Sequence, residues 1–363
     1  MQWPIIILRY VVKNADKGMK AIFPTLTVAI PNYNHGHFLP GCLNSVLCQE
    51  MIPDEILIID DASTDDSVDI IKSYQNSNIN LRLVCNIKNE GVISVINKCL
   101  QLATGKYILI LSADDFLLPG FLSQSLNLLN TFPHAGLCCA LPYEMRVDNK
   151  LRINPMPIPT NKSTYITAKE TMDLLIKEDS WFWGNTVILN REIALEFQGF
   201  RKELHSFCDN FLYRTISLKY GSCFIPKHLS VYRTYSTSYS KTIMSNLSIM
   251  QEIFEETLSL MSSSFSDIFC KKLINRWQQR WRFTMLNSMI ETQNISRSKV
   301  TNLLSTHKLL SHLLFNTHVT HFFIGRFVFR LYLFIYYRWF DMFTVVRRRI
   351  KATYFKYCRG HNK

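Results

Sequence analysis

The ten cysteines of this 363-residue sequence include no pair at the Cys-x-x-Cys spacing. That absence argues against the common zinc sites, which place two ligands close together in sequence. The apolar run Trp3–Leu8 has no basic segment before it and no small-residue cleavage site after it, so we expect no signal peptide. Because cysteines of proteins that are not exported stay reduced, we expect free thiols rather than disulfides.

Acidic residues are scarce in the last third of the chain. Residues 241–363 hold 19 Lys and Arg but only 6 Asp and Glu, whereas residues 1–240 hold 22 of each kind. The entire net charge of +13 therefore lies after residue 240. Such an asymmetry is typical of a tail that meets an anionic surface, either a membrane or a nucleic acid.

A long uninterrupted apolar segment is also missing. Residues 322–346 are rich in Phe, Leu, Ile, Tyr and Val, but they are interrupted by Arg326, Arg330, Arg338 and Asp341. Each charge at a bilayer centre costs about 2.5–3.5 kcal/mol, so we expect no membrane span here. The charges fall near one stripe of a helix with aromatic residues opposite, and Arg347-Arg348-Arg349 follow. This pattern predicts an in-plane helix on anionic lipid within residues 311–351.

One alternative for this tail is an amphipathic helix that packs on the rest of the chain or on a second copy. Nucleic acid is not expected as a partner. Nucleic-acid grooves interleave aromatic and basic side chains, whereas here the aromatic residues gather on the apolar face.

Three apolar runs in the first third each end in polar or acidic residues. They are Leu26–Ile30 before Pro31-Asn32-Tyr33-Asn34, Glu55–Ile59 before Asp60-Asp61, and Tyr107–Leu111 before Ser112-Ala113-Asp114-Asp115. Runs of this kind without alternation predict strands buried on both faces, as in a parallel sheet. Ligands bind outside the carboxyl ends of such strands, so all four aspartates should meet at one crevice. Clustered carboxylates favour a hard divalent metal that holds phosphates.

Helix and strand signals alternate through residues 25–125 and predict a doubly wound α/β domain. The expected helices are Phe38–Gln49, Val68–Tyr74 and Val92–Ala103, and a further strand is expected at Leu81–Cys85. Residues 126–240 continue the globular part. There we expect strands at Leu137–Ala140 and Thr186–Leu189, a helix at Asp209–Tyr220, and short strands at Cys223–Ile225 and Val231–Tyr232. From about Ser245 the pattern is helical.

Four segments in this order resemble a family-2 glycosyltransferase with the GT-A fold, over roughly residues 25–240. They are Thr27–Asn34, Glu55–Asp65, Asn89-Glu90-Gly91 followed by Asn97, and Ser112–Asp115. The resemblance implies a Rossmann-like, doubly wound mixed sheet followed by a C-terminal helical region. The implied organisation is an extension at 1–24, a nucleotide-sugar-binding half at 25–125, an acceptor-binding half at 126–240, and a basic, aromatic-rich helical tail at 241–363.

The resemblance also implies which residues bind the donor. The implied set is Pro31, Tyr33, Asn34, Asp60, Asp61, Asn89, Gly91, Asn97, Asp114 and Arg233. Asp114 and Asp115 stand where the family binds Mn²⁺ or Mg²⁺, which would screen the charge of the departing diphosphate. Two departures are visible, because Ser112 replaces an Asp and Ile96 replaces an Arg that the family often carries.

On the acceptor side, Trp183-Gly184-Asn185 resembles the family's acceptor-binding strand, and Gly199-Phe200 resembles a conserved turn. Asp209 stands where many members carry the general base that removes a proton from the acceptor hydroxyl. One such base without a covalent nucleophile implies inversion at the anomeric carbon. The alternative for Asp209 is a helix N-cap, which would stabilise the helix by about 1 kcal/mol. Trp181, Phe182 and Trp183 are candidates for either ligand stacking or the core.

We therefore expect a metal-dependent, inverting, hexosyltransferase-like enzyme that acts in polysaccharide or lipid-linked glycan assembly. Its partners would be a nucleotide-sugar donor, a glycan or lipid-linked acceptor and an anionic membrane, which places it in the cytoplasm on the inner face of the plasma membrane. A sugar nucleotidyltransferase is the first alternative, but Pro31–His37 has one Gly and no Lys or Arg. A catalytically inactive binding module with the same fold is the second, and the acids Asp114, Asp115 and Asp209 argue against it.

Overall fold

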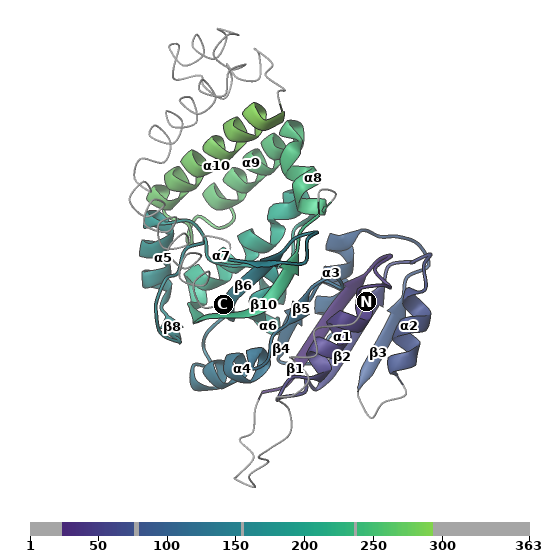
Figure 1. The fold of residues 1–363 in the computed structure, drawn as a ribbon. Helices are drawn as coiled ribbons and strands as arrows, with labels where there is room; N and C mark the ends of the chain where they lie inside the picture. The colour runs from purple at the N-terminus through teal and green to yellow at the C-terminus, as the bar shows by residue number, and fades with distance from the viewer. Residues whose placement is uncertain (1–23, 76–79, 154–155, 236–237, 293–363) are drawn as a thin grey trace, which may run out of the picture.

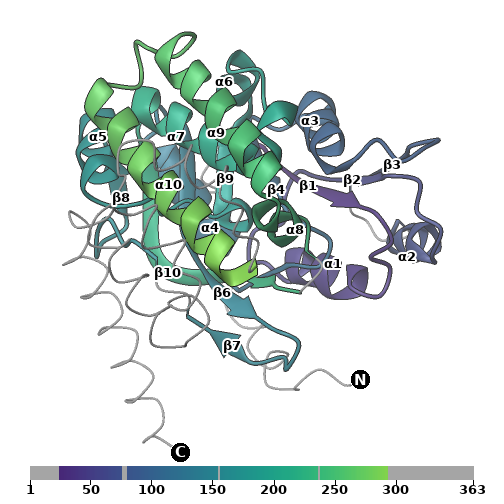
Figure 2. The same cartoon turned by 90° about the horizontal axis from the view of Figure 1, so that it is seen from above.

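The computed structural model describes residues 24–75, 80–153, 156–235 and 238–292 (Figure 1). Nearly all of the expected extension at 1–24 and the whole expected lipid-binding segment 311–351 lie outside these residues. Within them, one mixed sheet is covered by helices on both faces (Figures 1 and 2). The sheet has ten strands, and those on its main path follow the order β3-β2-β1-β4-β9-β6-β10-β5.

The first half of the sheet is parallel, as its sequence predicts. β2 (Glu55–Asp60) and β4 (Tyr107–Ile110) flank β1 (Leu26–Asn32), and β3 (Leu81–Cys85) pairs with β2. Every residue of β2 is buried, because helices cover both of its faces. The connecting helices are α1 (Leu39–Leu47), α2 (Ser67–Tyr74) and α3 (Val92–Leu102).

The second half makes the sheet mixed. β9 (Val187–Asn190) runs antiparallel to both β4 and β6 (Leu137–Met145), and β10 (Ser222–Arg233) is parallel to β6. The remaining strands are β5 (Phe116–Leu117), β7 (Leu151–Arg152) and β8 (Thr164–Ile166). The expectation of two short strands within 223–232 was wrong. They form one strand whose register shifts between Phe224 and Ser230, around Pro226, which lacks an N–H to donate to a ladder.

The helices divide into two layers, each with its own apolar core. One core lies beneath α1, α2 and α4 (Phe121–Thr131). The other lies beneath α3 and the helices of the second half, which are α5 (Ala168–Lys177), α6 (Arg191–Glu196), α7 (Cys208–Tyr220), α8 (Tyr239–Ser245), α9 (Leu247–Ser262) and α10 (Lys271–Thr292). Two 3-10 turns, η1 (Gly184–Thr186) and η2 (Lys202–Phe207), complete the described chain.

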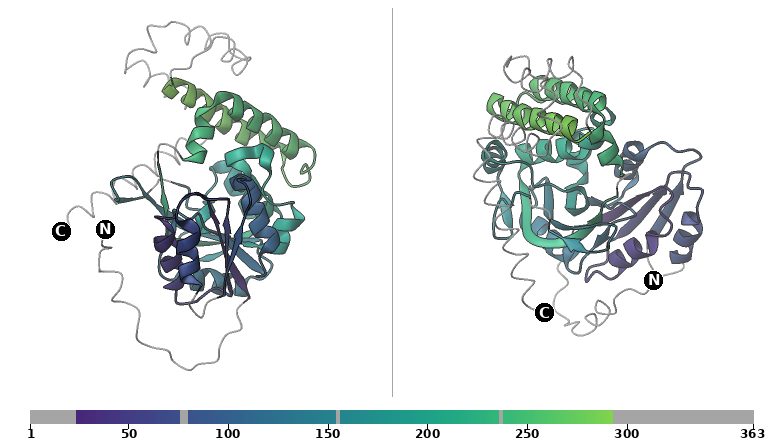
Figure 3. Two further views of the ribbon diagram at one scale, coloured as in Figure 1. Left: turned by 90° about the vertical axis from the view of Figure 1, so that its right-hand side faces the viewer. Right: turned by 45° about the horizontal axis from the view of Figure 1, so that its top comes forward.

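The helices after residue 240 contribute to the same apolar core as α7. Buried side chains from Ile243 to Leu286 belong to the core that also contains Phe207 and Phe211. Figure 3 shows α9 and α10 as an antiparallel pair lying over this part of the molecule. None of the described helices has the length and apolar character required to cross a bilayer. The nine cysteines within the described residues are free.

Glu55 ties the parallel strands together at the edge opposite their carboxyl ends. Its carboxylate accepts hydrogen bonds from Thr27 Oγ1 at 2.7 Å and from the Thr104 backbone N–H at 2.9 Å, and it lies 2.8 Å from Arg82 Nη2. Burial alone would raise the pKa of Glu55. The hydrogen bonds from Thr104 and Thr27 and the charge of Arg82 outweigh burial, so this pKa is lowered.

Glu55→Gln should lower the free energy of unfolding by about 2 kcal/mol at pH 7, because an amide cannot accept all of these hydrogen bonds. Since the folded-state pKa is lowered, the contribution of Glu55 is present above its unfolded pKa of about 4.3 and disappears as pH falls through the folded value. Urea unfolding at pH 7 and pH 3 measures both effects. Glu50→Gln, at an exposed position, is the control. An equal loss of unfolding free energy at pH 7 and pH 3 would show that the ionised Glu55 carboxylate is not the source of the stabilisation.

Candidate active site

The strand-end acids lie at the carboxyl edge of the parallel strands, where the sequence places them. β1 and β2 pair in register so that Asn32 lies opposite Asp60, and the Asp61 N–H donates to the Asn32 carbonyl at 2.8 Å. Asp114 and Asp115 follow β4 on the other side of β1. The two acid pairs therefore flank the end of β1, as parallel strands require.

Asp60 is engaged in holding its own turn. Its carboxylate accepts hydrogen bonds from Asn32 Nδ2 at 2.8 Å and from the Ser63 N–H and hydroxyl at 2.9 and 2.6 Å. Ser63 Oγ in turn accepts the Asn34 N–H at 2.9 Å. Asp60 thus fixes the loop that carries Pro31, Tyr33 and Asn34, and Tyr33 projects from that loop with 45% of its surface exposed.

Asp61 lies at the centre of a second network. Its carboxylate accepts Asn86 Nδ2 at 2.7 Å and the backbone N–H groups of Glu90 and Gly91 at 2.9 Å each. Gly91 has φ +84°, a conformation that favours glycine. Asn86 Oδ1 accepts a hydrogen bond from Lys98 Nζ. A carboxylate offers about four acceptor positions, so these three hydrogen bonds leave Asp61 with one more.

Asp114 and Asp115 form a carboxylate pair beside Arg233. Asp115 Oδ1 accepts the Arg233 backbone N–H at 2.9 Å, and Arg233 Nε donates to the Asp114 carbonyl at 2.7 Å. Burial raises the pKa of Asp115 well above its ordinary value, and the charge of Asp114 raises it further. Burial also raises the pKa of Asp114, against the opposing charges of His35, Arg233 and His37. The pair therefore has an affinity for positive charge that the protein itself does not satisfy.

Aromatic rings hold the Arg233 guanidinium in place. It lies 5.0 Å from the centre of the Phe38 ring and 5.3 Å from that of Phe116. Tyr235 packs against Phe38 with ring centres 5.8 Å apart. Residues at the end of β10 and just before α1 thus lie beside the acid pair. His35 belongs to the loop that precedes α1.

Asp209 lies in the first turn of α7. The N-cap of that helix is Phe207, which makes no side-chain cap, and Asp209 Oδ1 accepts only the adjacent Asn210 N–H among the described hydrogen bonds. Asp209 is therefore not the N-cap. A Cβ atom built on Gly184 would lie 3.5 Å from Asp209 Oδ2, so this oxygen faces η1. Burial raises the pKa of Asp209 to about 6.

The turn that faces Asp209 contains a buried polar group without partners. Asn185 is 5% exposed, and neither its amide nitrogen nor its amide oxygen has a hydrogen-bond partner among the described residues. Next to it, Trp183 packs on Tyr232 at 4.6 Å, and Tyr232 directly precedes Arg233. Trp181 and Phe182 are fully buried and belong to the core. Burial of an amide without hydrogen-bond partners is unfavourable.

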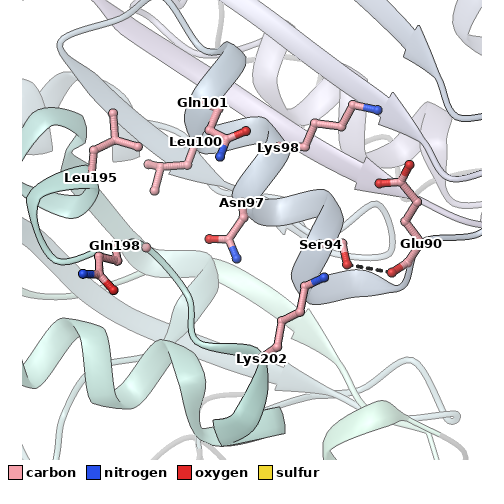
Figure 4. Close-up of a pocket in the computed structure, with 10 residues that line it drawn as sticks. Glu90, Ser94, Asn97, Lys98, Leu100, Gln101, Leu195, Gln198 and Lys202 are labelled. Carbon is pink, nitrogen blue, oxygen red and sulfur yellow. Dashed lines mark hydrogen bonds between the residues drawn. The ribbon is translucent and has the colours of Figure 1, made fainter. Parts of the chain in front are cut away.

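Asn97 has a structural role in the observed fold. Its Nδ2 donates to the Phe200 carbonyl at 2.7 Å, and its Oδ1 accepts the Phe200 N–H at 2.8 Å. It lines a pocket of about 630 Å³ between α3 and the turn at Gln198-Gly199 (Figure 4). This pocket contains neither Asp114 nor Asp209, and it touches the network around Asp61 only at its edge, through Glu90 and Lys98. We therefore place the chemistry at the acids and not in this pocket.

The residues present fit a divalent metal only in part. Among the described residues, no three His, Cys, Asp or Glu side chains form a cluster that could hold a metal ion. Asp114 and Asp115 supply two carboxylates, and the half-buried Asp114 is the more accessible of them. Mg²⁺ sites commonly take one or two carboxylates and complete their shell with substrate phosphates and water. Two acids suit such a shared site.

Sequence reasoning missed Asn32, Asn86 and Lys98, which orient the first acid pair. No local pattern marks them, since each acts through a side-chain contact that only the folded chain creates. The expected donor-binding residue Asn89 has a supporting contact in the structure. Its Oδ1 accepts the Gly91 N–H at 3.1 Å and so supports the turn that binds Asp61.

Comparison with known proteins agrees with this arrangement. The pattern of "Glycosyl transferase family 2" matches residues 27–197. The "Uncharacterized protein MT1568" of Mycobacterium tuberculosis is 29% identical over 228 residues, which cover 61% of this chain and 70% of that protein. The "Putative teichuronic acid biosynthesis glycosyltransferase TuaG" of Bacillus subtilis is 34% identical over 92 residues, 25% of this chain and 36% of its own.

Two solved structures share the fold. S. aureus TarS 1-349 in complex with UDP-GlcNAc superposes with a TM-score of 0.54 at 16% identity, covering 92% of both chains. The mannosyltransferase PcManGT of Pyrobaculum calidifontis, in complex with GDP-Man and Mn²⁺, gives a TM-score of 0.50 at 15% identity over 86% of this chain and 85% of its own. The matched residues include both strand-end acid pairs, and the fold is the one these enzymes have. Residues 27–197 of this chain therefore match glycosyl transferase family 2, and the described fold is of the GT-A type.

Proposed function

We propose that this glycosyltransferase is inverting and moves a sugar from a nucleotide-sugar donor to an acceptor hydroxyl. The observation that carries the proposal is the connection between its two acid sites. Asp209 faces Gly184, Trp183 packs on Tyr232, and the next residue, Arg233, binds the Asp114–Asp115 pair. One short path of contacts thus joins a buried carboxylate base to a carboxylate pair that favours cations.

The donor would bind along the ends of β1, β2 and β4. Asp61 has one acceptor position left, which suits an N–H of the nucleobase, and Pro31, Tyr33 and Asn34 form the adjoining wall. Asn89 and Gly91 would support this site through the turn that binds Asp61, and Asn97 holds the turn at Phe200. Arg233, whose guanidinium contacts the rings of Phe38 and Phe116, would bind the diphosphate. The similar structures hold UDP-GlcNAc and GDP-Man, which supports a nucleotide sugar as the donor class.

Asp114 would hold Mn²⁺ or Mg²⁺ directly, while Asp115 anchors the start of the Arg233 loop. When bound, such an ion neutralises charge on the departing diphosphate. The Mn²⁺ complex of a protein with this fold supports a divalent metal here.

Asp209 would accept the proton of the attacking hydroxyl. The acceptor oxygen forms a bond to the anomeric carbon while the bond from that carbon to the diphosphate oxygen breaks, and the diphosphate leaves with the electron pair. Attack from the face opposite the leaving group inverts the configuration. The unpaired amide of Asn185, with Trp183 and Gly184, would bind the acceptor.

We further propose that the acceptor is a glycan or a lipid-linked glycan at the inner face of the plasma membrane. The relative involved in teichuronic acid biosynthesis supports a polysaccharide as the product class. The basic, aromatic-rich sequence within 311–351 supports attachment to anionic lipid.

Asp114→Asn should abolish metal-dependent nucleotide binding without unfolding the protein, because it removes the accessible carboxylate of the pair. Isothermal titration of UDP and GDP with and without Mn²⁺ measures this effect. Asp69→Asn, at an exposed position on α2, is the control and should bind as the wild type does. Mn²⁺-dependent affinity that survives in Asp114→Asn would overturn the metal assignment.

Asp209→Asn should keep nucleotide binding, lose transfer and gain stability. The pKa of about 6 in the folded state lies above an unfolded value of about 3.9, so the buried carboxylate costs folding free energy. That cost is absent below pH 4 and complete above pH 6, where relieving it should stabilise the variant by about 3 kcal/mol. Urea unfolding at pH 4 and pH 8 measures the difference.

The wild-type transfer rate should correspondingly fall as pH drops through about 6, because only the ionised Asp209 can accept a proton. A variant that loses nucleotide affinity as strongly as transfer would show that Asp209 supports the donor site instead.

Truncation after Ser311 should release the protein from vesicles that contain anionic lipid and leave the catalytic residues intact. Each Lys or Arg near such a surface gains about 1 kcal/mol, which salt weakens. Vesicle flotation at low and high ionic strength measures the binding, with neutral vesicles as the control. If the truncated protein floats as the full chain does, residues 312–363 are not the attachment. If it aggregates, they pack on the enzyme.

A further inference from the structure

The loop that delivers Asp209 is strained. His205, inside η2, has φ 45° and ψ −127°, a backbone conformation that L side chains rarely adopt. Such a residue costs about 1–3 kcal/mol and persists only where its surroundings determine it. Phe207 ends η2 and is the N-cap of α7, two residues before Asp209. The position of Phe207 therefore sets where the first turn of α7 begins.

Phe207 is clamped between its own helix and α10. Its ring meets the Trp281 ring edge-on at 5.0 Å, and the Arg214 guanidinium lies 5.3 Å from its centre. Trp277, one turn before Trp281, lies 6.0 Å from the same ring. Trp281 is itself fixed, because its Nε1 donates to the Met250 carbonyl of α9 at 3.2 Å.

Buried cations fix α10 to the acceptor half. Arg280, adjacent to Trp281 and 6% exposed, donates to the Leu175 carbonyl at 2.6 Å and the Ile176 carbonyl at 3.3 Å, at the end of α5. Cations are favourable at a helix C-terminus, where unpaired carbonyls collect. Arg214 pairs with Asp179, two residues beyond α5, at 3.3 Å. α5, α7 and α10 are thereby held together around Phe207.

We propose that α10 sets the position of the catalytic base, with Trp281 as the positioning residue that acts through Phe207. This inference rests on the proposed role of Asp209. It assigns a part in catalysis to a helix that lies beyond the family match, which ends at residue 197. A general base must lie within hydrogen-bonding reach of the proton it removes, and a displacement of about 1 Å can lower a rate about 100-fold. Loosening Phe207 would allow a displacement of that size.

The variants are Trp281→Ala, which opens the clamp, and Trp281→Phe, which keeps a ring against Phe207. Met285→Ala is the matched control, since Met285 lies one turn further along α10 and is 1% exposed. It should lower the melting temperature as Trp281→Ala does. All measurements are made on the full chain, below the lowest melting temperature of the set.

The first readout is Mn²⁺-dependent hydrolysis of UDP-N-acetylglucosamine and GDP-mannose, in which water replaces the acceptor. Trp281→Ala should lower kcat at least tenfold, with KM for the donor within twofold of the wild type. Trp281→Phe should recover most of the rate, and Met285→Ala should stay within twofold. Equal losses in Trp281→Ala and Met285→Ala, or no loss in either, would overturn the proposal.

The second readout does not depend on turnover. Carbon-13 NMR of the Asp209 carboxyl, assigned by its absence in Asp209→Asn, reports how deeply that group is buried. Trp281→Ala should move its pKa from about 6 toward the ordinary value for aspartate, while Met285→Ala should leave it unchanged. An unchanged pKa in Trp281→Ala would refute the clamp. Absence of hydrolysis by the wild type would count against the proposed function alone, because the carboxyl titration still tests the clamp.

Discussion

Burial of carboxylates with too few cations is the constraint on which the site depends. Asp114 and Asp115 lie together at the end of β4, and burial raises the pKa of both. Arg233 neutralises them only in part, because its guanidinium is held between the rings of Phe38 and Phe116 and donates to a backbone carbonyl. An arrangement of this kind is unfavourable alone and becomes favourable when a ligand brings positive charge.

The parallel half of the sheet makes this arrangement possible. Residues at the ends of adjacent parallel strands must come together, whatever their separation in sequence. The hydrogen bonds at that edge then divide the acids by task. Asp60 closes the turn after β2, Asp61 keeps one acceptor position, and the Asp114–Asp115 pair lies buried beside Arg233. Asp209 belongs to a different layer, and its position depends on helix packing rather than on strand register.

The strands and acid pairs of the first half were predictable from sequence because their signal is local. Unbroken runs such as Glu55–Ile59 identify a strand buried on both faces, and the acids that follow need no further information. The path of β10 was not predictable in the same way, since pairing with β6 carries it past Pro226. The role of Asp60 was also not predictable. In the structure, Asp60 accepts hydrogen bonds from Asn32 and Ser63 and so closes the turn after β2, whereas the resemblance implies a ligand contact.

For the helices after residue 240, the sequence likewise predicts the elements but not their contacts. Their periodicity predicts helices, but nothing in the sequence shows that Trp281 meets Phe207 or that Arg280 reaches the carbonyls that end α5. Contacts across more than 70 residues are decided by tertiary packing, which a helical pattern does not encode. The proposal that Asp209 is a base came from the resemblance alone, and the burial of Asp209 and its separation from the N-cap became visible only in the fold.

The central claim is that the Asp114–Asp115 pair would hold a divalent metal that neutralises charge on the diphosphate of the donor. An anomalous difference map from a crystal grown with Mn²⁺ and UDP tests this claim most directly. The account predicts one strong manganese peak between the Asp114 carboxylate and the diphosphate oxygens. It also predicts that the uracil ring of UDP lies beside Asp61. Nucleotide bound instead in the pocket between α3 and Gln198-Gly199, with no peak at Asp114, would contradict it.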